Sequence, residues 1–369
     1  MPVRPVPSPD AAAPSGRQRP LLVTADAALL DDVLRCAGDA GAEVDVVADL
    51  AAARPAWPAA PLVLVGVDRL DPLPDEALPR RAGVLVVEAG GGAPASWEVA
   101  ATVGAEAVLT LPGAEPVLVE RLTVLADAAR GVTVAVLPGR GGAGATTVAV
   151  ALARAAARGR RTLLLDADPW GGGIDLALGA ESRPGLRWAD LDATRGATGP
   201  DELRSALPTV DGLPVLAWSR HRSPQVDRVV AASVLSAARR GHDLVIADLP
   251  RQPHPVADAV LAVADVALVV VPADLRSVAA ALVVADRVRG AVGDVRAVVR
   301  GPAPSGLAGP EVAAALGLRY AGWLAPEPGL AARVDRGEPP GAAGRGRLSV
   351  FCRALLADLP ARRDPGRAA

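Results

Sequence analysis

A run of glycines and threonines at residues 139–147 has the composition of a loop that binds phosphate. It reads Gly-Arg-Gly-Gly-Ala-Gly-Ala-Thr-Thr and lies between an apolar segment and a run of small residues. In a strand–loop–helix unit the backbone N–H groups point into one concavity, and the helix dipole adds roughly half a positive charge there. The sequence therefore predicts a nucleotide-binding loop made of Gly139, Arg140, Gly141, Gly142, Ala143, Gly144, Ala145, Thr146 and Thr147.

The loop lacks the lysine that in such loops reaches the β- and γ-phosphates, because Ala145 stands at that position. No other lysine can take its place, since all 39 lysine and arginine residues of the chain are arginines. We therefore expect that binding of ATP or ADP with Mg²⁺ is weak or lost. Hydrolysis of ATP is expected to be slow or absent.

Three aspartates follow apolar segments that read as buried strands. Asp166 and Asp168 end the segment that starts at Arg161, and Asp248 ends the segment that starts at His242. The carboxyl ends of parallel strands meet at the ligand crevice of an open sheet, so Asp248 is expected to converge with the loop. A single aspartate at a strand end often serves only the turn. Three of them in this order favour a functional site.

These segments resemble the MinD/ParA family of P-loop proteins. The loop departs from the family's deviant Walker A motif, Gly-Lys-Gly-Gly-x-Gly-Lys-Thr-Thr, only at Arg140 and Ala145. In the family the first lysine reaches the nucleotide of the other subunit in a dimer. Arg140 keeps that charge and can bind phosphate through two N–H groups, so the resemblance implies a homodimer.

The resemblance also implies roles for the aspartates. The Asp166–Asp168 segment is similar to switch I of the family, and Asp248 is similar to a Walker B aspartate. Thr146, Asp166 and Asp248 would then hold Mg²⁺, directly or through water. Asp168 would be the catalytic residue that positions the attacking water, if the site is active.

The resemblance extends over roughly residues 130–360. It predicts strands at 264–273, 295–300 and 320–324, helices at 276–289 and 311–316, and a last loop and helix at 326–337. Arg300 and Gly301 stand where the family has an Asn-Arg pair that reads adenine. Recognition of the base is therefore expected to differ from that of the family.

The first third of the chain alternates short apolar strands with helical stretches, as a parallel α/β sheet does. The predicted strands lie at 21–24, 44–47, 62–65, 83–87 and 107–109, with a helix at 28–40. This segment resembles the receiver domain of response regulators, most clearly at residues 104–112.

The receiver-like segment departs from the family at its phosphorylation site. Gly66 stands where the phosphoacceptor aspartate should end the third strand, and Leu111 replaces the lysine before Pro112. Glu88 replaces the hydroxyl residue after the fourth strand, and only Asp26 remains of the acidic cluster. We expect a pseudo-receiver used for docking or dimerisation. A shifted loop that brings Asp68 into the site is a less favoured alternative.

The predicted fold class is α/β, with two doubly wound parallel-sheet domains. Residues 20–129 would form the receiver-like, flavodoxin-like domain, and 130–360 the MinD/ParA-like P-loop NTPase domain. Residues 1–19 would be a disordered tail and residues 361–369 a flexible tail. Because 51% of the residues are hydrophobic and only 2% aromatic, the cores must consist of Ala, Val and Leu.

Charge, cysteine content and hydropathy limit the location and partners. The net charge of −2 gives no drive toward nucleic acid, and the two cysteines, Cys36 and Cys352, indicate a reducing cytosol. No apolar run reaches the length of about 18 residues needed to span a membrane. The amphipathic segment 348–359 is expected to pack in the core. Trp170, directly after switch I, is equally compatible with an interface and with a buried role.

A pseudo-receiver joined to a lysine-free MinD-like domain resembles the CpaE/TadZ group, especially its actinobacterial septum-site-determining (Ssd) branch. The resemblance implies a cytoplasmic spatial regulator that positions the division septum or a pilus or secretion machine. Its partners would be proteins of that machinery, which would recruit it to the cytoplasmic face of the membrane, and no specific nucleic acid is expected. Two alternatives remain open: an active ATPase switch that forms an ATP-sandwich dimer, and a scaffold that works without nucleotide.

Overall fold

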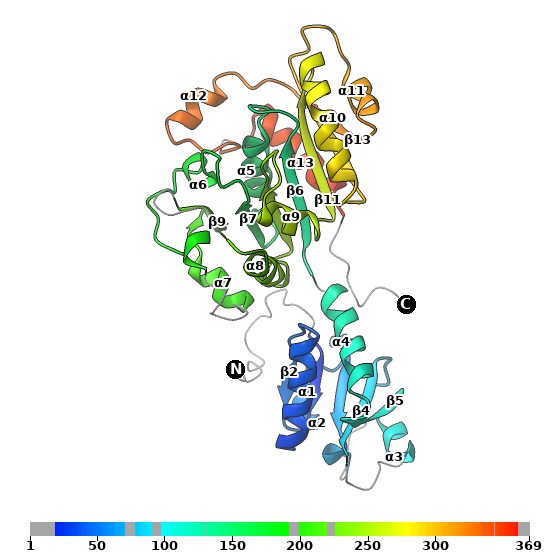
Figure 1. Ribbon diagram of the computed structural model, residues 1–369. Coiled ribbons are helices and arrows are strands. Elements are labelled where there is room, and N and C mark those ends of the chain that lie inside the picture. Colours follow the sequence, from blue (N-terminus) through cyan, green and yellow to red (C-terminus); the bar gives the residue numbers. More distant parts are fainter. Residues whose placement is uncertain are drawn as a thin grey trace. The chain divides into compact units, whose positions relative to one another are not determined.

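The structure, a computed structural model, describes residues 19–70, 78–90, 97–128, 130–191, 199–219, 226–342 and 344–360. Of the two predicted tails, only Arg19 lies within these residues. The chain divides into two compact units, the first within residues 1–129 and the second within 130–362 (Figure 1). No helix among the described residues is long and apolar enough to cross a membrane.

The first unit is a five-stranded parallel sheet with the strand order β2-β1-β3-β4-β5. Its strands are β1 (Leu21–Val23), β2 (Asp45–Val47), β3 (Val63–Gly66), β4 (Val84–Ala89) and β5 (Ala107–Leu111). Its helices are α1 (Ala27–Asp39), α2 (Leu50–Ala53), η1 (Val67–Arg69), α3 (Trp97–Thr102) and α4 (Glu115–Ala128). The order places β1 between β2 and β3. The strand order therefore changes direction between the neighbouring strands β1 and β3, which is the switch point of such a sheet.

Alternate residues of each strand pack in two separate cores of this unit, one on each face of the sheet. Leu21 and Val23 pack with residues of α2 and α3 on one face, whereas Leu22 packs with α1 and α4 on the other. This division follows from the two-residue period of a strand, which sends neighbouring side chains to opposite faces. The sheet is therefore covered on both sides, as parallel sheets require.

The second unit contains an eight-stranded sheet with the order β13-β12-β11-β6-β10-β7-β9-β8. Its strands are β6 (Val132–Pro138), β7 (Thr162–Asp166), β8 (Thr209–Val210), β9 (Leu213–Leu216), β10 (Leu244–Asp248), β11 (Val266–Pro272), β12 (Val295–Arg300) and β13 (Arg319–Leu324). All neighbours are parallel except β8 and β9. The central strand β6 lies between β10 and β11, where the crevice of such a sheet opens.

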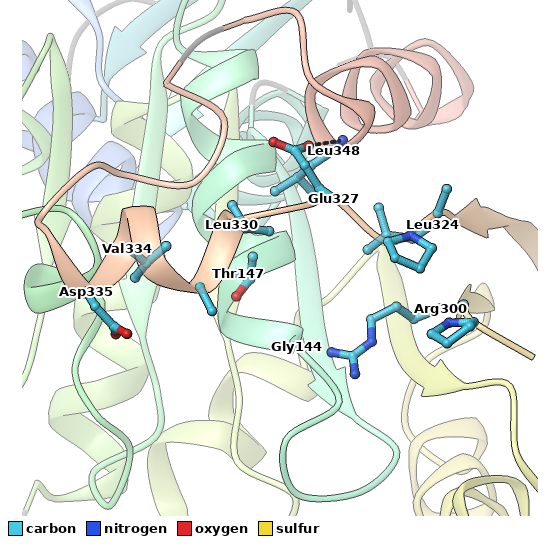
Figure 2. A pocket seen from close by; sticks show the side chains of 14 residues that line it. Gly144, Thr147, Arg300, Leu324, Glu327, Leu330, Val334, Asp335 and Leu348 are labelled. Carbon is cyan, nitrogen blue, oxygen red and sulfur yellow. Dashed lines mark hydrogen bonds between the residues drawn. The ribbon is translucent and has the colours of Figure 1, made fainter.

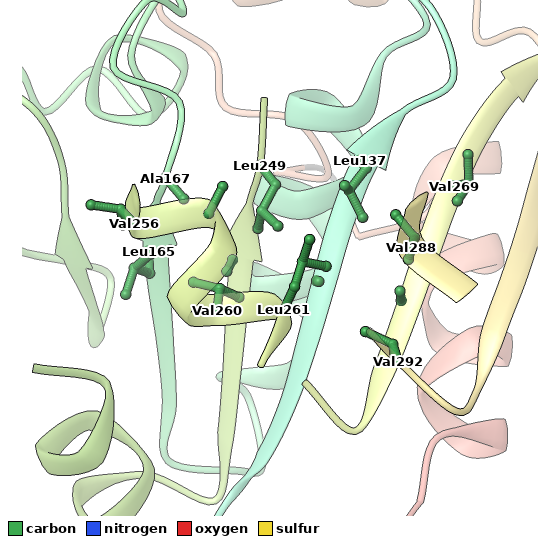
Figure 3. Close-up of a cluster of buried hydrophobic side chains, with 14 of the residues drawn as sticks. Leu137, Leu165, Ala167, Leu249, Val256, Val260, Leu261, Val269, Val288 and Val292 are labelled. Carbon is green, nitrogen blue, oxygen red and sulfur yellow. The ribbon is translucent and has the colours of Figure 1, made fainter. Parts of the chain in front are cut away.

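Helices cover both faces of this sheet. They are α5 (Ala145–Ala156), α6 (Ile174–Ala177), η2 (Trp188–Asp190), α7 (Pro200–Ala206), α8 (Arg228–Gly241), α9 (Pro255–Leu261), α10 (Leu275–Arg289), α11 (Gly309–Ala315), α12 (Leu330–Asp335) and α13 (Arg347–Asp358). Residues of α7 to α11 form one core, part of which is seen in Figure 3. Residues of α5, α6 and α13 form the other. Both cores consist mainly of Ala, Val and Leu, as the composition predicts.

The helix α13 packs in the core, as expected from its amphipathic sequence. Leu348, Cys352 and Leu355 are buried in the same cluster as the residues of α5. Buried Arg296 of β12 ties the end of the helix to the sheet through an ion pair of 2.8 Å with Asp358. The helices α7, α8 and α9 and the short strands β8 and β9 were not predicted from the sequence.

Candidate functional site

The glycine-rich loop connects the end of β6 to the N-terminus of α5. Gly142 and Gly144 have φ angles of 72° and 97°, in the left-handed region that other residues rarely adopt. Gly139 is needed for another reason, because a Cβ there would lie 2.8 Å from the Cβ of Ala281 on α10. The glycines therefore fix both the shape of the loop and its close approach to α10.

The amides of this loop form a cradle for an anion. Within the described residues, Gly139, Ala143 and Val148 donate the recorded backbone hydrogen bonds of the segment. The amides of Gly141 and Gly144 are left available, and they adjoin the positive end of the α5 dipole. A phosphate group fits this set of donors without any side chain.

Two buried carboxylates lie beside this cradle. Asp248 and Asp166 are the last residues of β10 and β7 and are directly paired in the sheet register. The hydroxyl of Thr146, in the first turn of α5, hydrogen-bonds to Asp248. The structure thus brings the three predicted metal-binding residues to the same edge of the sheet.

Burial disfavours the charged form of both carboxyl groups. It raises the pKa of Asp248 to about 7, although the Thr146 hydroxyl opposes this shift. Burial also raises the pKa of Asp166 well above its usual value, and the charge of Asp248 raises it further. Such a pair favours the binding of a cation. A divalent ion would offset the repulsion between the two carboxylates and their loss of hydration.

The carboxylate of Asp166 also holds the following loop. It accepts hydrogen bonds from the amides of Asp168, at 3.0 Å, and Ile174, at 3.2 Å. Asp168 itself is half-buried and accepts a hydrogen bond from the amide of Trp170. The indole of Trp170 is 81% exposed, so this tryptophan is a surface residue and not part of the core.

The donor set fits Mg²⁺ only together with phosphate. Among the described residues there is no cluster of three or more His, Cys, Asp or Glu side chains that could hold a metal by itself. Asp166 and Asp248 with the Thr146 hydroxyl supply oxygen ligands, which Mg²⁺ prefers. The remaining positions would have to be filled by water and by the phosphates of a nucleotide in the cradle.

Arg140 lies folded against the start of α10. Its Nε donates to Oγ of Ser277 at 2.5 Å, and its Nη2 lies 3.9 Å from a carboxylate oxygen of Asp274. The side chain is 42% exposed. The guanidinium is thus accessible at the surface of the loop, but it is oriented by its own subunit.

A cavity of about 480 Å³ adjoins the loop, a size that suits a small-molecule ligand (Figure 2). Gly144 and Thr147 line it from the loop and the start of α5, and Leu330 and Val334 line it from α12. Glu327 also lines the cavity. Its carboxylate accepts hydrogen bonds from the Leu348 amide at 2.9 Å and from Arg333 at 2.5 Å, and so connects α13 and α12.

Two residues of the site were not predicted from the sequence. Trp188 is fully buried, donates from Nε1 to the carbonyl oxygen of Asp166 at 2.6 Å, and stacks on Trp218. The scarcity of aromatic residues could have marked these tryptophans. Arg300 was considered only as a replacement in a base-reading pair, but its guanidinium points to the loop beside Gly144 (Figure 2).

The receiver-like unit has a different arrangement at the ends of β1 and β3. Asp68 reaches back to accept hydrogen bonds from the Thr24 hydroxyl at 2.8 Å and the Ala25 amide at 2.9 Å. Asp26 caps the N-terminus of α1. The hydroxyl of Thr110 donates to buried Glu88 at 2.6 Å. The carboxyl groups that remain here are therefore engaged in holding the fold.

Sequence comparisons match two families, one to each part of the chain. Residues 23–133 match the family described as the Rv3660c-like, CheY-like N-terminal domain, and 134–252 match the CobQ/CobB/MinD/ParA nucleotide binding domain. Over 289 residues the chain is 40% identical to protein Rv3660c of Mycobacterium tuberculosis strain H37Rv. The alignment covers 77% of this chain and 81% of the relative.

Solved structures resemble the second unit. A ParA family ATPase from Chlorobium tepidum gives a TM-score of 0.56 at 14% identity, covering 62% of this chain and 98% of that chain. The MinC:MinD cell division complex of Aquifex aeolicus gives 0.52 at 22%, covering 63% and 99%. The septum site-determining protein MinD of Pyrococcus horikoshii, complexed with Mg-ADP, gives 0.50 at 15%, covering 62% and 96%. The fold is thus a CheY-like domain followed by a MinD/ParA-type P-loop domain.

Proposed function

Because the chain belongs to the family of Rv3660c, in which a CheY-like domain precedes a MinD/ParA-type domain, we propose that it is a spatial regulator with a degenerate nucleotide site. It binds ATP or ADP with Mg²⁺ weakly and hydrolyses ATP poorly. It acts by recruiting partner proteins. The functional domains are residues 20–129 and 130–360.

One observation carries the nucleotide part of this proposal. The loop keeps its backbone cradle and the Thr146–Asp248 pair, yet Ala145 ends at a Cβ where a lysine would extend. Binding of phosphate and Mg²⁺ depends mainly on the groups that remain. The MinD of Pyrococcus horikoshii, which has the same fold, was solved with Mg-ADP.

Poor hydrolysis follows from the missing charge. Catalysis of phosphoryl transfer is largely a matter of positioning and of stabilising charge on the transferred group. Loss of one such electrostatic group costs about 10²–10³-fold in rate in well-studied enzymes. Asp168 remains to position water, so it is the catalytic residue of whatever turnover persists.

The cellular role that we propose is the positioning of a division septum or of a pilus or secretion machine. The likeness to MinD, in a complex named for cell division, and to a ParA family ATPase supports a role in spatial organisation. The Ssd branch of the CpaE/TadZ group is the subgroup that we infer. The protein works in the cytoplasm as a homodimer and reaches the membrane face through its partners.

The receiver-like domain supplies a docking or dimerisation surface in this proposal. Its phosphorylation site lacks the aspartate at Gly66 and the lysine at Leu111. Leu111 is instead fully buried in the core of the unit. A domain that keeps this fold without the chemistry is suited to binding another protein.

The experiment replaces the native gene by a fluorescently tagged copy that carries Gly142→Val, and compares its position in the cell with that of the wild type. A β-branched residue is strained at the φ of 72° and distorts the loop. Gly306→Val is the matched control, because Gly306 has the same φ of 72° and also faces open space.

We expect that Gly142→Val loses the focal position of the protein and changes the number or placement of septa or surface machines, whereas Gly306→Val does neither. If both variants localise and function like the wild type, nucleotide plays no part and the scaffold alternative is correct.

A further inference from the structure

Arg300 crosses from the sheet to the glycine-rich loop. It is the last residue of β12, and its Nη1 donates to the carbonyl oxygen of Gly142 at 3.3 Å. Figure 2 shows the guanidinium beside Gly144. A Cβ at position 144 would lie 3.0 Å from the same nitrogen. The absence of a side chain at Gly144 therefore lets the guanidinium lie directly on the loop.

Among the described residues, no carboxylate forms an ion pair with this guanidinium. None of the ion pairs recorded among the described residues includes Arg300, although many of the other arginines are paired. The side chain is half-buried, and burial lowers its pKa, with the charge of Arg140 acting in the same direction. Its one recorded acceptor, the carbonyl of Gly142, is neutral and at long range. An anion bound at the loop would relieve this imbalance.

Arg300 also lines the cavity beside the loop, together with Gly144 and Thr147. A ligand that fills the cavity and places its phosphates at the loop would therefore lie beside the guanidinium. Arginine can bind phosphate oxygens through two parallel N–H groups, and such charged hydrogen bonds are stronger than the existing bond to a carbonyl.

We propose that Arg300 supplies to the polyphosphate chain of a bound nucleotide the positive charge that the loop has lost at Ala145. The charge comes from the end of β12 and not from the loop, and it favours di- and triphosphates over monophosphates. The inference rests on the nucleotide site of the proposed function and adds a phosphate-binding residue to it.

Calorimetry on the full chain tests this inference with three probes in the presence of Mg²⁺: ADP, AMP and inorganic tripolyphosphate. Arg300→Ala is expected to weaken binding of ADP and tripolyphosphate about tenfold to a hundredfold, the range of a charged hydrogen bond. Binding of AMP should change by less than about threefold. Arg300→Lys should retain part of the affinity because it keeps the charge.

Two further variants control for indirect effects. Arg319→Ala removes an arginine at the start of the neighbouring strand β13, where it pairs with Asp358 away from the loop, and should leave all affinities unchanged. Ala145→Lys combined with Arg300→Ala should restore tripolyphosphate binding, because it returns a cation to the loop itself. Thermal melting of each variant shows whether it remains folded.

The outcomes separate this inference from the function on which it rests. Equal ADP affinity in the wild type and Arg300→Ala overturns the role of Arg300 and leaves nucleotide binding intact. Arg300-dependent binding of tripolyphosphate without any binding of ADP supports the role of Arg300 and contradicts the nucleotide function. If the wild type binds none of the probes, both are wrong.

Discussion

The carboxylate of Asp68 occupies the space into which a side chain at Gly66 would project, since a Cβ at Gly66 would overlap its Oδ1. Asp68 thereby joins the ends of β1 and β3 through its bonds to Thr24 and Ala25. Its other neighbour is Arg69, whose Nε lies 2.7 Å away. The carboxylate of Asp68 is thus engaged by Thr24, Ala25 and Arg69.

We therefore predict that small phosphodonors do not label the receiver-like domain. Transfer to an aspartate needs Mg²⁺ and a lysine beside the nucleophile, and the chain contains no lysine. Intact-mass spectrometry after incubation with acetyl phosphate should show no added phosphate, while a receiver with a complete site is labelled under the same conditions. An acyl-phosphate on Asp68 would overturn the pseudo-receiver assignment.

Asp68→Asn should destabilise the first unit by about 1–3 kcal/mol at neutral pH, because it weakens a set of charge-assisted hydrogen bonds. Burial opposes ionisation, but the bonds from Ala25, Arg69 and Thr24 outweigh it and lower the pKa of Asp68. The larger free energy of unfolding of the wild type is then present above the unfolded pKa of about 3.9. It is lost as the pH falls through the folded pKa of Asp68.

Urea unfolding followed by hydrogen exchange of the peptide that contains buried Trp57, from a near-neutral pH down to the acid limit of folding, measures this difference. Asp31→Asn, at an exposed position of α1, is the control and should unfold like the wild type. If Asp68→Asn remains equally less stable than the wild type in acid, the charge of Asp68 does not cause the loss of stability.

The stability of the second unit should depend on pH and Mg²⁺ through Asp248. Its folded pKa of about 7 lies above the unfolded value, so the folded state holds a proton that the unfolded chain releases. The stability contribution is full below the unfolded pKa and is lost as the pH rises toward about 7, by at most about 1.4 kcal/mol per pH unit. Mg²⁺ with ADP should offset this loss, because the metal compensates the carboxylate.

Thermal melts should therefore show a larger stabilisation by Mg-ADP near pH 8 than near pH 6. Asp248→Asn and Thr146→Ala should both reduce it, the first by removing the charge and the second by removing a metal-facing hydroxyl. A stabilisation that is independent of pH and equal in Asp248→Asn would exclude this carboxylate from the metal site.

Arg140→Ala should impair nucleotide-linked dimerisation more than nucleotide binding. The side chain is accessible, and release from Ser277 would free it for a second subunit. Light scattering with and without Mg-ATP should show an increase in mass for the wild type that Arg140→Ala lacks. Arg276→Ala, which removes an exposed arginine at the start of α10, should retain the increase. If Arg140→Ala dimerises normally, Arg140 does not reach the partner.

The glycine-rich loop and its carboxylates could be predicted because they depend on local order. A strand, a turn of glycines and a helix are adjacent in sequence, and Asp166 and Asp248 each end an apolar strand. Parallel pairing then brings such strand ends to one edge of the sheet without further information. Short apolar runs that alternate with helical stretches likewise predict most strands of both units.

The position of Arg300 could not be predicted in this way. It depends on how a long side chain extends from β12 to the loop, past Gly144, which has no side chain. The loop lies more than a hundred residues earlier in the sequence. The contact of Trp188 with the end of β7 has the same origin, since the residues between them form no regular pattern. The strands β8 and β9 are too short for a two-residue period to be recognised.

The most direct test of the central claim measures ATP binding and phosphate release on one sample of the wild-type protein with Mg²⁺. The account predicts a saturable binding heat at high nucleotide concentration. It also predicts phosphate release at least about a hundredfold slower than that of a MinD-type ATPase with its lysine. Phosphate release at the rate of such an enzyme, abolished by Asp168→Ala, would contradict the account and establish an active switch.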